Sequence, residues 1–342
     1  MKKHLNTLFV TTQGAYLHLE SEAVVVRVDK EIKLRVPVLS IAGIVCFGNV
    51  LVSPPLMGFC ADKQVAITFL SEYGRFLARV QGPVSGNVLL RKAQYRTSDD
   101  PEGAATVARS ILAGKILNAK TVLQRALRDH GEKLDRPRME EAVERLKSSA
   151  RHLERPQGLD NLRGIEGEAA AAYFDVFEML ITTNREHFQF DGRNRRPPRD
   201  RVNCLLSFVY TILMHDVRSA LESVGLDPQV GFLHRDRPGR PGLALDLMEE
   251  FRPIVADRLV LSLVNLGKVK AGGFIIEESG VTMDDETRKV VLVSYQERKK
   301  EEITHPFLGE KVALGFVFHL QALLLARHLR GDLDAYPPFV LK

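Results

Sequence analysis

The chain has 342 residues, a length that predicts about two domains. Its composition, 45% hydrophobic and 27% charged, is that of a globular protein, which excludes a long disordered or collagen-like chain. The longest uncharged stretch, 36–61, is broken by prolines and polar residues, so no membrane span is predicted. The first residues lack the apolar run of a signal peptide. We therefore expect a soluble cytoplasmic protein without a membrane partner.

The net charge of +5 suggests an anionic partner, but the charge is unevenly distributed. Residues 1–95 contain 11 Lys and Arg against 6 Asp and Glu, whereas the remaining residues contain 37 of each. A nucleic-acid site in the larger part must therefore be a local patch of basic residues, because the overall field there is neutral.

Residues 1–86 are predicted to form a β-rich, sandwich-like domain. Short runs rich in Val and Ile, such as AVVVRVD at 23–29, alternate with a period of two and are separated by turn residues. Ser53 followed by Pro54 is typical of a helix start, and this single helix is expected to run to about Asp62.

Residues 87–342 change to a helical period and are predicted to form a larger, all-α domain. Apolar residues recur at i, i+3, i+4 and i+7 in 88–96, 104–127 and 139–154. The stretch 272–278 begins with two glycines, and the sequence does not determine whether it is ordered. The predicted fold class is thus α+β, with the sheet domain first and the helical domain second.

The three cysteines are widely spaced, with no CxxC pair, which excludes a zinc ribbon and a disulfide framework. Each lies among apolar residues, so we expect buried, unreactive thiols in a reducing compartment. The sequence also lacks the phosphate-binding loop, the dinucleotide-binding glycine motif, HExxH and GxSxG.

A first candidate site lies in 161–180, where Gly164 and Gly167 flank Glu166 at the expected start of an alanine-rich helix. The residues three, four and seven positions after Glu166 are small or apolar, and a carboxylate on such a face is costly unless it is paired or binds a metal. The alternative is a first-turn carboxylate that complements the helix dipole.

A second candidate lies in 225–253, where His234 ends a short apolar run and a helix follows from about Leu243. Asp246 and Glu249 share one face of that helix, and Glu250 is a further possibility. One histidine with two carboxylates is a ligand set suited to Mg²⁺ or Mn²⁺. A histidine buried in the core without any ligand role is the alternative.

A third candidate is a loop that contains five arginines and can contact phosphates through planar guanidinium groups. The arginines are Arg193, Arg195, Arg196, Arg199 and Arg201. Solvent exposure or neutralisation by acidic helices would equally explain them. The helix expected over 109–138 carries further basic residues, Lys115 among them, which are interpreted as a solvated face.

These segments together resemble one family, the CRISPR adaptation integrases, the universal CRISPR-associated endonucleases that insert new spacers. The resemblance covers nearly the whole chain and rests on motifs in a fixed order. They are GAYLHLE at 14–20, IVCFGNVLVSPPLMGFCADKQVAITFLSEYGRFLARV at 44–80, LRGIEGEAAAAYF at 162–174, R-x-RRPP-x-D-x-VN-x-LLSF at 193–208, GLDPQVGFLH at 225–234 and DLMEEFRP at 246–253.

The resemblance implies a β-rich N-terminal domain that forms a homodimer, a helical catalytic domain, and a small partner, the second CRISPR adaptation protein. It places the metal ligands of the family on Glu166, His234 and Glu249, with Asp246 as a supporting carboxylate or an alternative ligand. A bound Mg²⁺ or Mn²⁺ would then assist attack on a phosphodiester by the 3′-OH of spacer DNA, or by water. The five arginines would hold double-stranded DNA by its backbone.

Two other functions stay open from the sequence. One is a non-catalytic DNA-binding scaffold that keeps the fold, and the other is a structure-specific nuclease that acts on branched DNA in repair.

Overall fold

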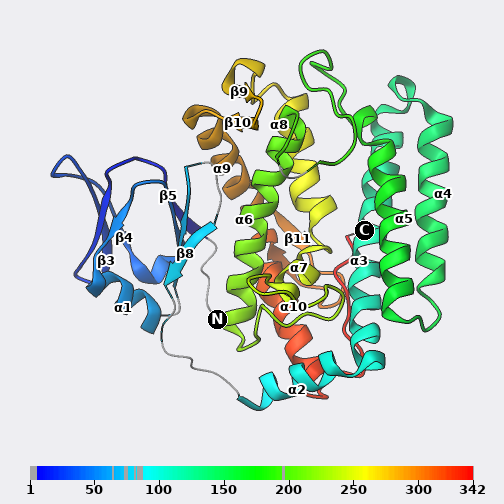
Figure 1. Ribbon diagram of the computed structural model, residues 1–342, viewed down its shortest axis with the longest axis horizontal. Coiled ribbons are helices and arrows are strands. Elements are labelled where there is room, and N and C mark those ends of the chain that lie inside the picture. The colour runs from blue at the N-terminus through cyan, green and yellow to red at the C-terminus, as the bar shows by residue number, and fades with distance from the viewer. Residues whose placement is uncertain are drawn as a thin grey trace.

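The computed structural model describes residues 6–63, 65–72, 76–80, 82, 88–194 and 197–341. It has a strand-rich N-terminal part beside a mostly helical remainder, which confirms the predicted fold class (Figure 1). The predicted boundary between residues 86 and 87 lies outside the described residues.

The N-terminal part is a sandwich of two four-stranded sheets. One sheet has the order β1-β5-β7-β8 and the other β4-β3-β2-β6. Buried side chains from both sheets, including Leu17, Val24, Ile44 and Ile67, form one core between them. The strands are β1 (Asn6–Val10), β2 (Tyr16–Glu20), β3 (Ala23–Val28), β4 (Glu31–Pro37), β5 (Ile41–Phe47), β6 (Leu51–Val52), β7 (Ala66–Leu70) and β8 (Phe76–Val80).

The single predicted helix of this part is confirmed. Helix α1 (Pro54–Asp62) follows Ser53, whose hydroxyl accepts a hydrogen bond from the Leu56 amide. The side chain therefore caps the helix end, and proline occupies the first turn, where no intrahelical amide bond is needed.

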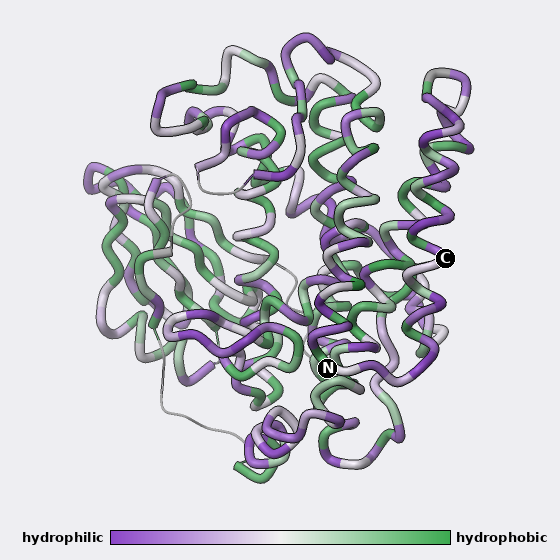
Figure 2. The backbone as a smooth tube through the Cα atoms, turned by 45° about the vertical axis from the view of Figure 1, so that its right-hand side comes forward, coloured by the Kyte–Doolittle hydropathy of each residue, from purple (hydrophilic) through white to green (hydrophobic). Residues whose placement is uncertain are grey.

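The helical part is built from amphipathic helices, along which hydrophobic and hydrophilic residues alternate within each turn (Figure 2). The helices are α2 (Val88–Asp99), α3 (Pro101–His130), α4 (Arg136–His152), α5 (Leu159–Asp175), α6 (Arg201–Ser223), α7 (Gly242–Met248), the π-helical turn η4 (Arg252–Asp257), α8 (Arg258–Asn265), α9 (Asp285–Lys300) and α10 (Leu314–Leu329). Helices α3, α4 and α5 pack against one another, and α10 packs against α6.

Two small antiparallel sheets add to the helices that the sequence predicts. β9 (Phe274–Glu277) pairs with β10 (Gly280–Met283), and β11 (Glu302–Thr304) pairs with β12 (Lys311–Ala313). The stretch 272–278 is thus described, mostly as strand. These strands of three or four residues are too short to show a clear period of two in the sequence.

The two parts contact each other through both apolar and polar side chains. Phe47 of β5 packs against Phe208 of α6, with ring centroids 6.0 Å apart. Arg79 of β8 forms an ion pair with Glu222 of α6, and Lys299 of α9 donates a hydrogen bond to the Thr7 hydroxyl.

Helix α6 is long and apolar enough to cross a membrane, a feature that the sequence analysis did not single out. In the structure 67% of its most apolar window is buried, as in the central helix of a folded core. Its residues Leu205, Leu206, Val209 and Leu213 belong to the main hydrophobic core.

All three cysteines are buried, as predicted. Burial raises the pKa of Cys46 and Cys204 to about 12 and that of Cys60 to about 11, so none forms a reactive thiolate near neutral pH.

Candidate catalytic and metal site

The loop that carries His234 is held by one buried carboxylate. Asp246 of α7 accepts hydrogen bonds from the backbone amides of Phe232, Leu233 and His234, at 2.6, 2.9 and 3.0 Å. It also bonds to Nδ1 of the His234 ring. Both carboxylate oxygens are therefore used within the protein, and the ring is fixed with Nε2 pointing away from Asp246.

Gly231 allows this loop to approach the carboxylate. A Cβ at this position would lie 2.7 Å from Oδ2 of Asp246 and 2.7 Å from the carbonyl carbon of Gly242. No larger residue fits without moving the backbone, so the glycine of the GFLH motif is required by packing.

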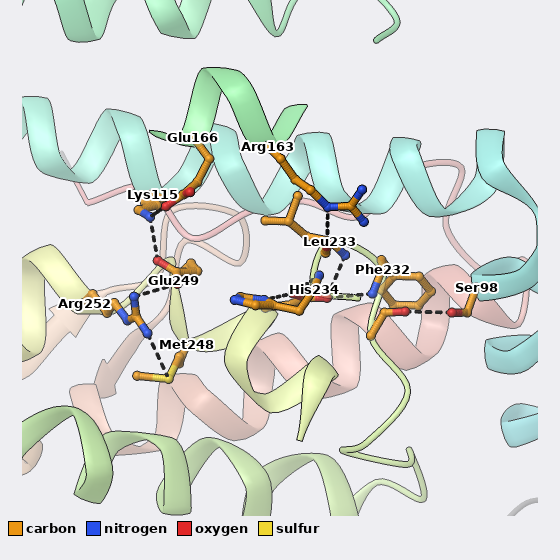
Figure 3. A network of polar contacts seen from close by, with 12 residues as sticks. Ser98, Lys115, Arg163, Glu166, Phe232, Leu233, His234, Met248, Glu249 and Arg252 are labelled. Atoms are coloured by element: carbon orange, nitrogen blue, oxygen red, sulfur yellow. Dashed lines mark hydrogen bonds and ion pairs between the residues drawn. The ribbon is translucent and has the colours of Figure 1, made fainter. Parts of the chain in front are cut away.

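Helices on two other sides secure the same loop. The Gln94 amide of α2 donates to the carbonyls of Asp227 and Val230, and the Ser98 hydroxyl donates to that of Gly231. From α5, Nε of Arg163 donates to the Leu233 carbonyl at 2.9 Å (Figure 3). The loop is thereby fixed next to the helix that carries Glu166.

Glu166 lies in the middle of α5 rather than at its start. The helix begins at Leu159, and Asp160 is the acidic residue of its first turn. The alternative in which Glu166 complements the helix dipole is therefore wrong, because that effect is confined to the first turn. The side chain is 32% exposed and points toward Lys115 of α3, with which it forms an ion pair (Figure 3).

Glu249 follows α7 and faces Glu166 across Lys115. Its side chain is 3% exposed and pairs with the Lys115 ammonium at 2.8 Å and with the Arg252 guanidinium at 2.7 Å. Burial by itself would raise the pKa of Glu249. Arg252 and then Lys115 overcome that effect, and the pKa falls to about 2, so the carboxylate is charged at neutral pH.

Arg252 is itself held by an aromatic ring. Its guanidinium lies over Tyr210 of α6, 4.8 Å from the ring centroid, and the Tyr210 hydroxyl donates to Asp257 at 2.6 Å. The guanidinium of Arg193 also lies over Tyr210, at 5.2 Å. The ring therefore links the arginine loop to the residues around Glu249.

Lys115 and Arg252 belong to the site, although neither was predicted from the sequence. Lys115 was interpreted as part of a solvated face, which is wrong because its side chain is only 13% exposed. The signal was available: the residues three and four positions away on either side are Ile111, Leu112, Asn118 and Ala119, all of which are buried. A lysine on the core-facing side of an amphipathic helix needs an acidic partner.

Glu250 points away from the site, so its consideration as a ligand is wrong. Consecutive residues in a helical conformation point in directions about 100° apart, so the side chains of Glu249 and Glu250 face different sides. Its Oε2 accepts hydrogen bonds from the Gln321 amide of α10 at 3.1 Å and from the Phe339 backbone at 2.8 Å. Burial raises the pKa of Glu250 to about 8, so this carboxyl is protonated at neutral pH.

We expect Glu250→Gln to stabilise the protein by an amount that grows as the pH rises from about 5 to about 8. The folded pKa of about 8 is above the ordinary value of 4.5, so the wild type loses stability as the pH rises from about 5 to 8, by at most about 1.4 kcal/mol per unit. Urea unfolding at pH 5.5 and 9 measures this. The gain of the variant over the wild type should be small at pH 5.5 and much larger at pH 9. The exposed Glu302→Gln is the control, and an equal gain at both pH values would contradict the prediction.

The structure describes three of the five loop arginines, and they differ in their environment. Arg193 donates to the side chains of Asn203 and Ser207, and Arg201 donates to the carbonyls of His187 and Ala271. Arg199 is exposed. Arg195 and Arg196 lie outside the described residues. Of the described three, Arg199 is exposed, whereas Arg193 and Arg201 are half-buried and anchor the loop.

A metal ion is compatible with the side chains that face one another here. Within the described ranges no three His, Cys, Asp or Glu side chains converge closely enough to hold an ion as they stand. However, the Lys115 ammonium already places a positive charge between the carboxylates of Glu166 and Glu249. Because Nδ1 of His234 is hydrogen-bonded to Asp246, Nε2 is the ring nitrogen left to bind a metal ion. This arrangement is typical of a metal-binding histidine.

Comparisons with known proteins identify the family of the chain. The family model for CRISPR associated protein Cas1 matches residues 8–297. The CRISPR-associated endonuclease Cas1 1 of Chlorobaculum tepidum is 58% identical over 99% of each chain, and the CRISPR-associated endonuclease Cas1 2 of Rhodospirillum rubrum is 53% identical over both full lengths. A solved Cas1 protein from Thermotoga maritima has the same fold, with a TM-score of 0.80 and 24% identity over 98% of this chain and 99% of that one.

The class defined by these relatives is that of the CRISPR-associated endonucleases, which confirms the predicted function as a nuclease of CRISPR defence. The chain belongs to the Cas1 family.

Proposed function

We propose that this protein is a divalent-metal-dependent DNA integrase and endonuclease that inserts spacer DNA into a CRISPR array in the cytoplasm. Glu166, Glu249 and His234 Nε2 would hold a Mg²⁺ or Mn²⁺ ion. The observation that carries the proposal is the facing pair of carboxylates on α5 and after α7, with a histidine fixed beside them.

The bound ion would polarise the scissile phosphate and stabilise the charge of the pentacoordinate transition state. The residues of the chain prepare the site for it. Arg252 keeps Glu249 ionised despite burial, and Asp246 keeps the His234 ring in one orientation. The attacking group is the 3′-OH of the incoming strand in joining, or water in cleavage. The mechanism needs no protein nucleophile.

Asp246 acts as a supporting carboxylate in this proposal, not as a ligand. Its oxygens accept four hydrogen bonds from the loop 232–234, whereas Glu249 faces Glu166. We therefore assign the third ligand to Glu249, whose partners are the side chains of Lys115 and Arg252 rather than the backbone of the loop.

The proposed partners are double-stranded DNA, a second copy of the chain and the small second CRISPR adaptation protein. Proteins of the same fold have been solved as a casposase bound to an integration product and within a complex that contains Cas1 and Cas2. For the homodimer, the outer face of one N-terminal sheet supplies the exposed apolar residues Leu51, Tyr16 and Ile32 on β6, β2 and β4, in register with Arg27 of β3, which lies between Tyr16 and Ile32.

Arg199 and Arg193 should give opposite results when each is replaced by alanine. Arg199→Ala removes an exposed charge, so DNA affinity falls at all sequences alike and the salt dependence weakens by about one ion. Arg193→Ala removes bonds to α6 and lowers the free energy of unfolding by about 1–3 kcal/mol. DNA titrations at several salt concentrations and urea unfolding separate the two effects. A stable Arg193→Ala variant with weakened DNA binding would contradict this assignment.

The function is tested with the full chain, a spacer-like duplex with 3′-OH ends, and a target containing a CRISPR leader and repeat. Joined product should form with Mg²⁺ or Mn²⁺ and disappear with EDTA, and the small partner should increase it. Branched DNA of the same length serves as the competing substrate. Faster hydrolysis of branched DNA than joining at the repeat would favour the repair nuclease, and binding without turnover would favour the scaffold.

A further inference from the structure

We propose that Lys115 is a resident counter-cation, which occupies the space between Glu166 and Glu249 in the metal-free protein and must move out before a metal ion can enter. The inference rests on the proposed function, because it concerns the same ion. It concerns a residue of α3 to which neither the family resemblance nor the sequence pattern assigned a role.

The contacts of Lys115 show that it serves both carboxylates at once. Its ammonium forms ion pairs with Oε1 of Glu166 and, at 2.8 Å, with Oε2 of Glu249 (Figure 3). These two side chains come from α5 and from the end of α7, so one cation joins three separate segments of the helical part. No other lysine in the described residues pairs with two different carboxylates of distant segments.

Burial makes this cation necessary. Glu249 is 3% exposed, and an ionised carboxylate at that depth is costly without compensation. Arg252 balances one of the two negative charges and Lys115 balances the other. When a divalent ion supplies two positive charges at the same carboxylates, the ammonium becomes a repelled like charge in a poorly solvated place.

The ammonium therefore competes with the ion for the same oxygens. The apparent affinity for metal is reduced by the fraction of molecules in which Lys115 still bridges the carboxylates. After displacement, the flexible side chain places its ammonium group next to the site. There the ammonium can contact an anionic phosphate. The lysine thus stabilises the empty site and sets a threshold for metal binding.

Lys115→Met tests the inference with Lys120→Met, on the same helix, as the matched control. Without divalent ions the Lys115→Met variant should unfold at a lower temperature than the wild type, because Glu249 keeps only one cationic partner. Its affinity for Mn²⁺, measured by titration of the free Mn²⁺ signal in paramagnetic resonance, should rise about tenfold. Lys120→Met should change neither quantity.

If Lys115→Met does not fold, a measurement on the wild-type protein tests the same inference. Acetylation of lysines followed by mass spectrometry should modify Lys115 several-fold faster in saturating Mn²⁺ than in EDTA, with Lys120 unchanged. Equal labelling of Lys115 in both conditions, together with unchanged Mn²⁺ affinity in any folded Lys115→Met protein, would overturn the inference.

Glu166→Gln distinguishes this failure from failure of the proposed function. If that variant binds Mn²⁺ as tightly as the wild type, the ion lies elsewhere and the proposed metal site is wrong. If Glu166→Gln loses Mn²⁺ while Lys115 labelling does not respond to Mn²⁺, the metal site stands and only the role of Lys115 is rejected.

Discussion

Glu166→Gln should abolish both joining and cleavage of DNA, with a loss of at least about 10³-fold in rate, or roughly 4 kcal/mol of transition-state stabilisation. The substitution keeps the size of the side chain and removes its charge. Because the side chain is 32% exposed, the free energy of unfolding should change by less than about 1 kcal/mol. Rates of strand joining with Mg²⁺ and Mn²⁺, and urea unfolding of the same preparation, measure the two effects.

The matched control is Glu168→Gln, which removes an exposed carboxylate two residues further along α5. It should leave both the rate and the stability unchanged. A Glu166→Gln variant that folds normally and still joins DNA at the wild-type rate would contradict the proposed mechanism. Equal losses in the two variants would point to the charge of the helix rather than to the site.

Asp246→Asn should damage both the fold and the chemistry. The buried carboxylate accepts four hydrogen bonds from residues 232–234, and an amide group would place an NH₂ donor against donors. We expect the free energy of unfolding to fall by about 3 kcal/mol. Loss of the bond to His234 Nδ1 also releases the ring, so metal affinity should fall by roughly 10–100-fold.

The control for this prediction is Asp236→Asn in the exposed part of the same loop, and a comparison with His234→Ala separates the two effects. His234→Ala should lower metal affinity with a smaller loss of stability, because the backbone bonds to Asp246 remain. An Asp246→Asn protein with the urea midpoint of the wild type would contradict the role assigned to Asp246.

Tyr210 lies between the arginine loop and the site and contacts residues of both. The ring has Arg252 at 4.8 Å and Arg193 at 5.2 Å, and its hydroxyl is bonded to Asp257. Substitutions in the loop that disturb Arg193 are therefore transmitted to the residue that keeps Glu249 ionised. Loss of activity in such variants does not by itself demonstrate contact with DNA.

The sequence predicted the features that depend on local spacing. Alternation with a period of two, as in 23–29, and the helical period after residue 87 are properties of the chain itself, so the two parts and helix α1 were predicted. The set of Glu166, His234 and Glu249 was implied by the resemblance to the CRISPR adaptation integrases. The same resemblance left two roles open for Asp246, a supporting carboxylate or an alternative ligand.

Only the tertiary structure decided which side chains meet. Lys115 lies 51 residues before Glu166, and no local period relates them. Glu249 and Glu250 are chemically alike and adjacent, yet packing makes one an ionised site residue and the other a protonated core residue. Asp246 holds the loop 232–234 because the backbone amides of that loop fold onto its carboxylate. Chain sequence sets the period and the available groups, whereas long-range packing sets their orientation, burial and charge.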